Sequence, residues 1–272
     1  MKLIVHPSFQ PHIDALQRAL PHAILLSGPA GIGLRTIALA IAGPALHLEP
    51  LDAEGKPSAN GSISAERIRG LYEDTRSKHE RLVVIIDDAD RLTPAAQGAF
   101  LKLLEEPAPR THFILTSHQP AHLLPTIRSR VQHFKVPPIT REQTEELLHS
   151  YPRLSTEEQA QLRFLAHGRP ALIARYAGDM EHFRGAAAVV RDARTVLSAP
   201  ERYDRLTAAL QYASRDKALQ LIDMCITLSR FALRSQATPD TIARLDRLVD
   251  THDAIKHNHN PRLQLLSLVV QL

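Results

Sequence analysis

The sequence has very little cysteine and few aromatic residues. Cys225 is the only cysteine among 272 residues, which excludes an internal disulfide and a zinc site built from several cysteines. Aromatic residues make up 4% of the chain and no run of lysines and arginines exists, so we expect no aromatic platform for single-stranded nucleic acid. The apolar surroundings of Cys225, LIDMCITL, predict a buried side chain on a helix rather than a reactive thiol.

Long apolar runs are absent as well. No stretch approaches the roughly 18 consecutive apolar residues that a membrane-spanning helix needs. The first ten residues, MKLIVHPSFQ, lack the basic and then apolar pattern of a secretory signal. We therefore expect a cytoplasmic protein without membrane contact.

Charge and histidine content exclude less. The formal net charge of +4 permits contact with nucleic acid but does not require it. The 15 histidines raise the hypothesis of a metal site, yet neither His118 with His122 nor His257 with His259 has an acidic or cysteine partner at ligand spacing. The sequence therefore predicts no metal site.

Three short apolar runs in the first half of the chain predict strands of a parallel sheet. They are AILLS at 23–27, LVVIID at 82–87 and HFILTS at 112–117. Uninterrupted runs of this kind suit strands that are buried on both faces. Between the last two runs we predict a helix that is capped by Thr93 and begins at Pro94. Strand, helix and strand at this spacing form a βαβ unit, so the predicted class is α/β.

The pattern divides the chain into three zones. Residues 1–138 alternate apolar runs with helical segments, residues 139–185 contain short helices, and residues 186–272 are helical throughout. Two capping boxes mark helix starts in the middle zone: Thr140 with Gln143, and Ser155 with Glu158. We expect a sheet domain, a small helical domain and a helical bundle, in that order.

Residues 28–36, GPAGIGLRT, follow a predicted strand and precede a predicted helix, as a phosphate-binding loop does. The glycines of the loop are present as Gly28, Gly31 and Gly33. Leu34 replaces the lysine that reaches the β- and γ-phosphates, Arg35 replaces the hydroxyl that binds magnesium, and Thr36 comes one place too late. The loop therefore predicts a degenerate nucleotide site without hydrolysis, and it leaves weak nucleotide binding open.

Acidic residues end the second apolar run. Asp87 fits the position of a magnesium-binding aspartate, and Asp88 stands where a water-polarising glutamate would be, with a side chain one methylene shorter.

The segment from residue 82 to 138 resembles the clamp-loader branch of the AAA+ ATPases along its whole length. It contains the acidic strand end, LLEEP at a helix end, a Thr-Ser pair after the next strand, and LLPTIRSR. The segments HAILLSGPAGIG and NPRLQLLSLVVQL extend the resemblance to the start and the end of the chain. The family's Ser-Arg-Cys motif reads Ser129-Arg130-Val131, so its cysteine is missing while the Ser-Arg pair remains.

This resemblance implies a three-part architecture. Residues 1–138 would be an AAA+ P-loop-type parallel sheet with helices on both faces, 139–185 a small helical lid, and 186–272 a helical collar that joins subunits in a ring. Motor subunits of the family keep the phosphate-loop lysine, which this chain lacks. The four-cysteine zinc module that many relatives carry after the first helix is missing too, because residues 43–47 continue without an inserted cysteine segment. We expect no cofactor, neither zinc nor ATP bound in cis.

The resemblance also implies roles for single residues. Arg130 would be an arginine finger acting in trans on the ATP of a neighbouring subunit, with Ser129 as its positioning partner and Arg128 as a second cation. Such fingers contribute about 10³–10⁵-fold to the rate of hydrolysis. Ser117 matches the first sensor, and Arg169 lies near the second. Without the surrounding match, Arg130 would be interpreted as an ordinary surface arginine.

The expected partners are the motor subunits (gamma or tau) and the delta subunit of a bacterial DNA polymerase III clamp loader. The sliding clamp is an indirect partner, and primer–template DNA is a further candidate. Two other functions stay open: a working ATPase motor, and a DNA-binding interaction module that reuses the fold. Hydrolysis by the isolated chain would favour the first, and salt-sensitive DNA binding the second.

Overall fold

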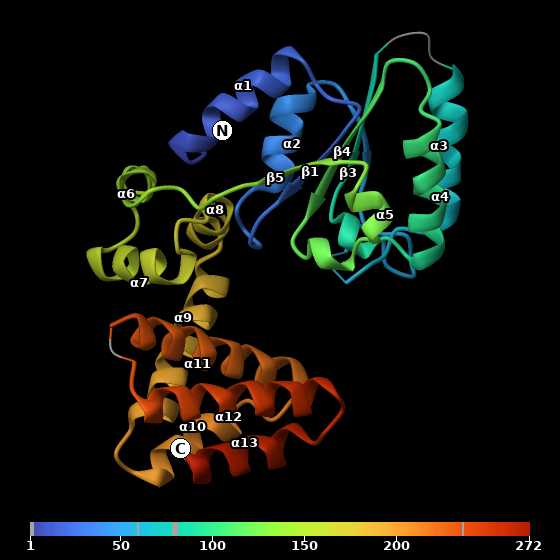
Figure 1. The fold of residues 1–272 in the computed structure, drawn as a ribbon. Helices are drawn as coiled ribbons and strands as arrows, with labels where there is room; N and C mark the ends of the chain where they lie inside the picture. Colours follow the sequence, from blue (N-terminus) through green and yellow to red (C-terminus); the bar gives the residue numbers. More distant parts are fainter. Residues whose placement is uncertain (1–2, 59, 78–80, 236) are drawn as a thin grey trace. The chain divides into compact units, whose positions relative to one another are not determined.

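The computed structural model describes residues 3–58, 60–77, 81–235 and 237–272. The chain forms two compact units, Met1–Gly178 and Asp179–Leu272, here called the N-terminal and C-terminal units. The N-terminal unit combines a sheet with helices, and the C-terminal unit consists of helices (Figure 1). The three-domain division of the sequence, with boundaries after residues 138 and 185, stays a prediction.

The described part of the N-terminal unit contains a parallel five-stranded sheet with the strand order β2-β3-β4-β1-β5. In chain order the strands are β1 (Ala23–Ser27), β2 (Leu46–Leu48), β3 (Leu82–Ile86), β4 (Thr111–Ser117) and β5 (Gln132–Lys135). The three strands predicted from apolar runs are confirmed, and they are the three central ones. The sequence did not predict β2 and β5, which are short edge strands with partly exposed side chains.

Helices cover both faces of the sheet (Figure 1). They are α1 (Gln10–Arg18), α2 (Leu34–Ala42), α3 (Ala65–Ser77), α4 (Pro94–Glu105) and α5 (Pro125–Arg128), with 3₁₀ turns at Pro7–Phe9, Ala89–Arg91 and Pro120–His122. Alternate residues of β1 point to opposite faces. Leu25 joins the core with Phe100 under α3 and α4, whereas Ile24 joins the core with Ile37 under α1 and α2. The predicted α/β class with helices on both faces is confirmed.

Three further helices complete the N-terminal unit: α6 (Arg141–His149), α7 (Thr156–Ala166) and α8 (Pro170–Gly178). Both predicted capping boxes are present, at the starts of α6 and α7. The start of α4 also agrees with the prediction, since the Thr93 side chain accepts a hydrogen bond from the Ala96 N–H at 3.2 Å. These contacts satisfy backbone N–H groups that have no partner inside the helix.

The C-terminal unit contains α9 (Met180–Ser198), α10 (Arg202–Leu210), α11 (Arg215–Ser235), α12 (Pro239–Lys256) and α13 (Pro261–Gln271). Its core includes Leu221, Leu248 and Leu265, one from each of the last three helices. Cys225 is buried among them, as predicted, and burial raises the pKa of its thiol to about 12. Within the described ranges, no helix combines the length and apolar character needed to cross a membrane.

Candidate functional site

The loop from Gly28 to Gly33 joins β1 to α2 at the carboxyl edge of the sheet. Gly31 and Gly33 have φ angles of +86° and +93°, a region that residues with a side chain rarely adopt. A Cβ on Gly31 would also lie 2.8 Å from the Cβ of Leu172 on α8. The bend of the loop therefore depends on these two glycines, and α8 packs directly against it.

Leu34 takes no part in a ligand site. Its side chain is only 3% exposed and belongs to the core beneath α1 and α2. Thr36 is exposed on the same helix and lines a cavity. The position at which the sequence pattern would have a lysine is thus filled by an apolar side chain that faces the core.

Arg35 takes part in an acidic cluster at the ends of neighbouring strands. Its Nη1 lies 2.8 Å from a carboxylate oxygen of Glu49 and 3.9 Å from Asp87 Oδ2. The other oxygen of Asp87 accepts a hydrogen bond from the Thr116 hydroxyl at 2.6 Å. A magnesium ion needs oxygen ligands at about 2.0–2.1 Å, and both Asp87 oxygens here already face other groups. These residues do not fit a magnesium site of the usual kind.

Asp88 lies beside this cluster with a left-handed backbone, φ 46°. Its carboxylate lies 3.5 Å from Nε2 of His118, whose Nδ1 is 2.8 Å from the Gly28 carbonyl oxygen. A carbonyl oxygen only accepts, so Nδ1 of His118 is the donor in this contact. Burial and the charge of Asp87 raise the pKa of Asp88, while His118 opposes the rise. His118 thereby connects the acidic strand end to the glycine loop.

The two predicted sensor residues make structural contacts. Ser117 is fully buried at the end of β4, and its hydroxyl accepts a hydrogen bond from the Gln119 N–H at 3.1 Å. Arg169 donates from its guanidinium to the carbonyl oxygens of Leu165, Ala166 and Ala30, at 2.7, 2.8 and 3.3 Å. Burial lowers the pKa of Arg169. Arg169 thus fastens the end of α7 to the glycine loop.

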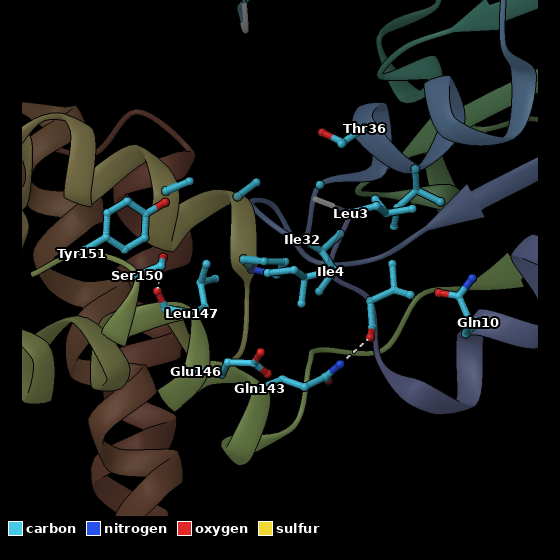
Figure 2. A pocket seen from close by; sticks show the side chains of 16 residues that line it. Leu3, Ile4, Gln10, Ile32, Thr36, Gln143, Glu146, Leu147, Ser150 and Tyr151 are labelled. Carbon is cyan, nitrogen blue, oxygen red and sulfur yellow. Dashed lines mark hydrogen bonds between the residues drawn. The ribbon is translucent and has the colours of Figure 1, made fainter. Parts of the chain in front are cut away.

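A cavity of about 410 Å³ adjoins the loop, between the N-terminal segment and helices α2, α6 and α8. Its wall is mostly apolar, with Leu3, Ile4, Ile32 and Leu147 beside a few polar groups (Figure 2). Gln143 closes one side, because its amide donates to the Val5 carbonyl oxygen at 2.8 Å (Figure 2). Concave, largely apolar pockets with few polar groups are typical small-molecule sites. Sequence reasoning missed this cavity, since its walls come from four separate segments.

The predicted Ser-Arg pair lies directly after α5. The Ser129 hydroxyl and Nη1 of Arg130 both donate to the Thr126 carbonyl oxygen, at 3.0 and 3.1 Å. Nη2 of Arg130 lies 3.0 Å from a carboxylate oxygen of Glu105, at the end of α4. The Arg130 side chain is 41% exposed, and Arg128 is exposed as well. Arg128 and Arg130 therefore both lie at the surface, and the Arg130 side chain is held by two contacts, with Thr126 and with Glu105.

Arg130 and the glycine loop lie at opposite ends of the parallel strands β1 and β5. β5 runs parallel to β1 with Gln132 alongside Ile24, so Arg130 precedes the amino ends of these strands. The glycine loop follows their carboxyl ends. From Ile24 to Gly28 the strand covers about 13 Å at ~3.3 Å per residue. Glu105, the partner of Arg130, comes shortly before the amino end of the neighbouring strand β4. The finger candidate is thus separated from the loop of its own chain.

Gln97, which the sequence did not single out, connects α4 to the segment before α5. Its amide donates to the His122 carbonyl oxygen at 3.1 Å and to the Leu92 carbonyl oxygen at 3.4 Å. Its oxygen accepts the Leu124 N–H at 2.7 Å. Gln97 is only 6% exposed. A buried amide with all these bonds satisfied fixes one segment relative to the other.

The chain is similar in sequence to subunits of DNA polymerase III. Residues 47–140 match the family model described as DNA polymerase III, delta subunit. The delta-prime subunit of DNA polymerase III from Pseudomonas aeruginosa is 33% identical over 189 residues, which are 58% of this chain and 56% of that protein. These matches support a delta-prime-like clamp-loader subunit. The matches to such delta-prime relatives span about half of the relatives' length.

Two further proteins are similar to this chain. Subunit gamma/tau of DNA polymerase III from Mycobacterium bovis is 33% identical over 137 residues, which are 42% of this chain and 24% of that protein. A solved structure of a DNA polymerase III gamma subunit-related protein from Thermotoga maritima has a TM-score of 0.52 at 19% identity and covers 97% of both chains. The likeness to the solved structure shows a shared fold.

In the parts of the chain that the structure describes, no three or more His, Cys, Asp and Glu side chains gather in an arrangement that could hold a metal ion. The predicted absence of a cofactor stays a prediction.

Proposed function

We propose that this chain is a non-hydrolysing stator subunit of a bacterial DNA polymerase III clamp loader. In this proposal Arg130 completes the ATP site of a neighbouring motor subunit while the sliding clamp is loaded during DNA replication. The observation that carries it is that Arg130 and the glycine loop of its own chain lie at opposite ends of the parallel strands β1 and β5. An arginine placed there serves a nucleotide bound to another subunit better than one bound to its own.

The side chains of the glycine loop support the absence of hydrolysis in cis. Leu34 is packed in the core, so no cation reaches the phosphates from that position. Arg35 pairs with Glu49 and Asp87, so the aspartate that would bind magnesium faces a guanidinium instead. Without metal and lysine, the developing charge on a transferred phosphate has no compensation. The chain is then an accessory subunit rather than an enzyme by itself.

The chemistry of a guanidinium suits Arg130 to the role in trans. Its planar fork can engage two phosphate oxygens at once, which the mobile ammonium of a lysine cannot. Ser129 binds the same carbonyl oxygen as Arg130 and so supports the local backbone, while Arg128 adds positive charge nearby.

The C-terminal unit supports assembly with other subunits. Ile242 and Val249 are 51% and 36% exposed on α12, and Leu263 and Val270 are 63% and 61% exposed on α13. Each pair is seven residues apart, so its members lie on one face of their helix. Exposed apolar side chains that share one face of a helix are candidates for contact with another protein. We infer that they contact the motor (gamma or tau) and delta subunits in the cytoplasm, with the clamp as an indirect partner and primer–template DNA as a further candidate.

A working ATPase is the second candidate function, and one observation favours it. The cavity beside Thr36 has the size and lining of a small-molecule site, so a nucleotide could enter it. This candidate predicts hydrolysis by the isolated chain. A DNA-binding module that reuses the fold is supported only by the net charge of +4, and it predicts salt-sensitive DNA binding by the chain alone.

Reconstitution tests the proposal. The chain is assembled with the motor and delta subunits of its organism, and ATPase is measured for the wild type, Arg130→Ala, Arg130→Lys and the exposed control Arg153→Ala. We expect both Arg130 variants to fold and to lower the ATPase rate and clamp loading sharply, since a finger contributes about 10³–10⁵-fold at the site that it serves. The control should match the wild type. An unchanged rate with Arg130→Ala would end the proposal.

A further inference from the structure

Arg130 and Glu105 form an ion pair within this chain. Glu105 is the last residue of α4, and Arg130 comes two residues after the end of α5. Glu105 Oε1 lies 3.0 Å from Nη2 of Arg130, and the Thr126 carbonyl oxygen lies 3.1 Å from Nη1. A guanidinium has five N–H groups. The two contacts use one N–H on each terminal nitrogen, and three N–H groups remain for another partner.

The position of Glu105 runs against local helix chemistry. It is the last residue of α4, and Glu106 follows it. The carboxyl end of a helix carries partial negative charge, which favours cations and disfavours carboxylates. Two consecutive glutamates there weaken the helix unless one of them has a cationic partner. Sequence choices that oppose local stability concentrate at functional positions, and Glu105 has Arg130 as its partner.

The backbone that carries the pair is fixed on both sides. The buried Gln97 amide bonds α4 to His122 and Leu124, which lead into α5. The distance between the end of α4 and Arg130 is therefore set by the fold, although both side chains of the pair are partly exposed, at 41% and 45%. An exposed pair adds little to folding stability, so removal of this pair should leave the stability of the fold nearly unchanged.

We propose that Glu105 is a positioning residue, which holds the Arg130 guanidinium with its free N–H groups directed outward for the phosphate of a neighbouring subunit. This rests on the proposed function of Arg130 and adds a second residue to it. A free arginine side chain has many rotamers and loses that freedom when it binds. Glu105 and the Thr126 carbonyl oxygen restrict the side chain beforehand, so that less freedom is lost as the transition state forms.

The test uses the reconstituted complex with Glu105→Gln and the matched control Glu106→Gln. Glutamine keeps the shape of the side chain and removes its charge, and Glu106 is the exposed neighbour in the same helix end. For Glu105→Gln we expect kcat for ATP to fall by about three- to tenfold, with KM for ATP unchanged. The unfolding midpoint of the isolated variant should equal that of the wild type. Glu106→Gln should behave as the wild type in each assay.

A double variant separates this inference from the proposed function. If Glu105 acts through Arg130, Glu105→Gln has no further effect on kcat once Arg130→Ala is present. An impaired Arg130→Ala with a normal Glu105→Gln overturns the role of Glu105 and leaves the finger intact. A rise of kcat in Glu105→Gln, or a further fall in the double variant, overturns it too. A normal Arg130→Ala overturns both.

Discussion

Replacing Gln97 by leucine tests whether the fold itself sets the place of Arg130. The change removes an amide that is buried and bonded to Leu92, His122 and Leu124. Leucine has a similar size and no polar atom. The His122 carbonyl oxygen and the Leu124 N–H, which lie in part-buried contacts with Gln97, would lose this partner at a cost of about 1–3 kcal/mol each. The gain from the more apolar side chain offsets part of this, and we expect a net loss of about 3 kcal/mol.

The assay combines thermal unfolding with hydrogen exchange. For a unit of this size, the expected loss lowers the melting temperature by roughly 6–12 °C. Exchange should accelerate in the segment from residue 119 to 131 more than in α1 or α2, because local opening follows the broken contacts. Gln161→Leu, at an exposed position on α7, is the control and should change stability little. A Gln97→Leu variant within about 0.5 kcal/mol of the wild type, with unchanged exchange in that segment, would refute the reasoning.

Three further predictions concern the loop, its acidic neighbour and the cysteine. Gly31→Ala should destabilise the protein by about 2–4 kcal/mol in chemical denaturation, and Gly43→Ala by only about 1–2 kcal/mol, since both need a positive φ but only Gly31 also meets a close neighbour. Equal losses would contradict this. The raised pKa of Asp88 means that the native state holds a proton more tightly than the unfolded chain, so this contribution to stability is lost as pH rises above about 3.8. Asp88→Asn should therefore raise the melting temperature at neutral pH and should change it least below about pH 3.8. An effect of Asp88→Asn on the melting temperature that is the same at every pH would contradict this prediction. Cys225 should react with a thiol reagent only after unfolding, because its pKa is raised to about 12, and rapid labelling of the native protein would contradict its burial.

The central part of the fold could be predicted from the sequence because it follows from local patterns. β1, β3 and β4 are buried on both faces, so each is a continuous apolar run. β2 and β5 lie at the edges, where one side of the strand pairs and the side chains stay partly exposed. Such a strand leaves no apolar signal, and QHFK in β5 gives none. The strand order also depends on pairing between distant segments, which no local pattern encodes.

The candidate site was predictable at the level of residues and not at the level of contacts. The spacing of the glycines in residues 28–36 shows that Leu34 and Arg35 replace the lysine and the hydroxyl residue of a phosphate-binding loop. It does not show that Arg35 turns to Glu49 and Asp87, because that depends on how β2 lies against β3. The pairs of His118 with Gly28 and of Glu105 with Arg130 are likewise made between elements that meet only in the folded chain. These contacts decide the chemistry of the site.

In this proposal Arg130 acts on a nucleotide held by another subunit, and the decisive measurement is a structure of the reconstituted clamp loader with ADP and a phosphate mimic bound to the motor subunits. We predict the Arg130 guanidinium within hydrogen-bond distance of the mimic on the adjacent motor subunit, with Glu105 still beside it and no mimic bound at the loop of residues 28–36. An Arg130 side chain that faces solvent, far from any bound phosphate, would overturn the proposal.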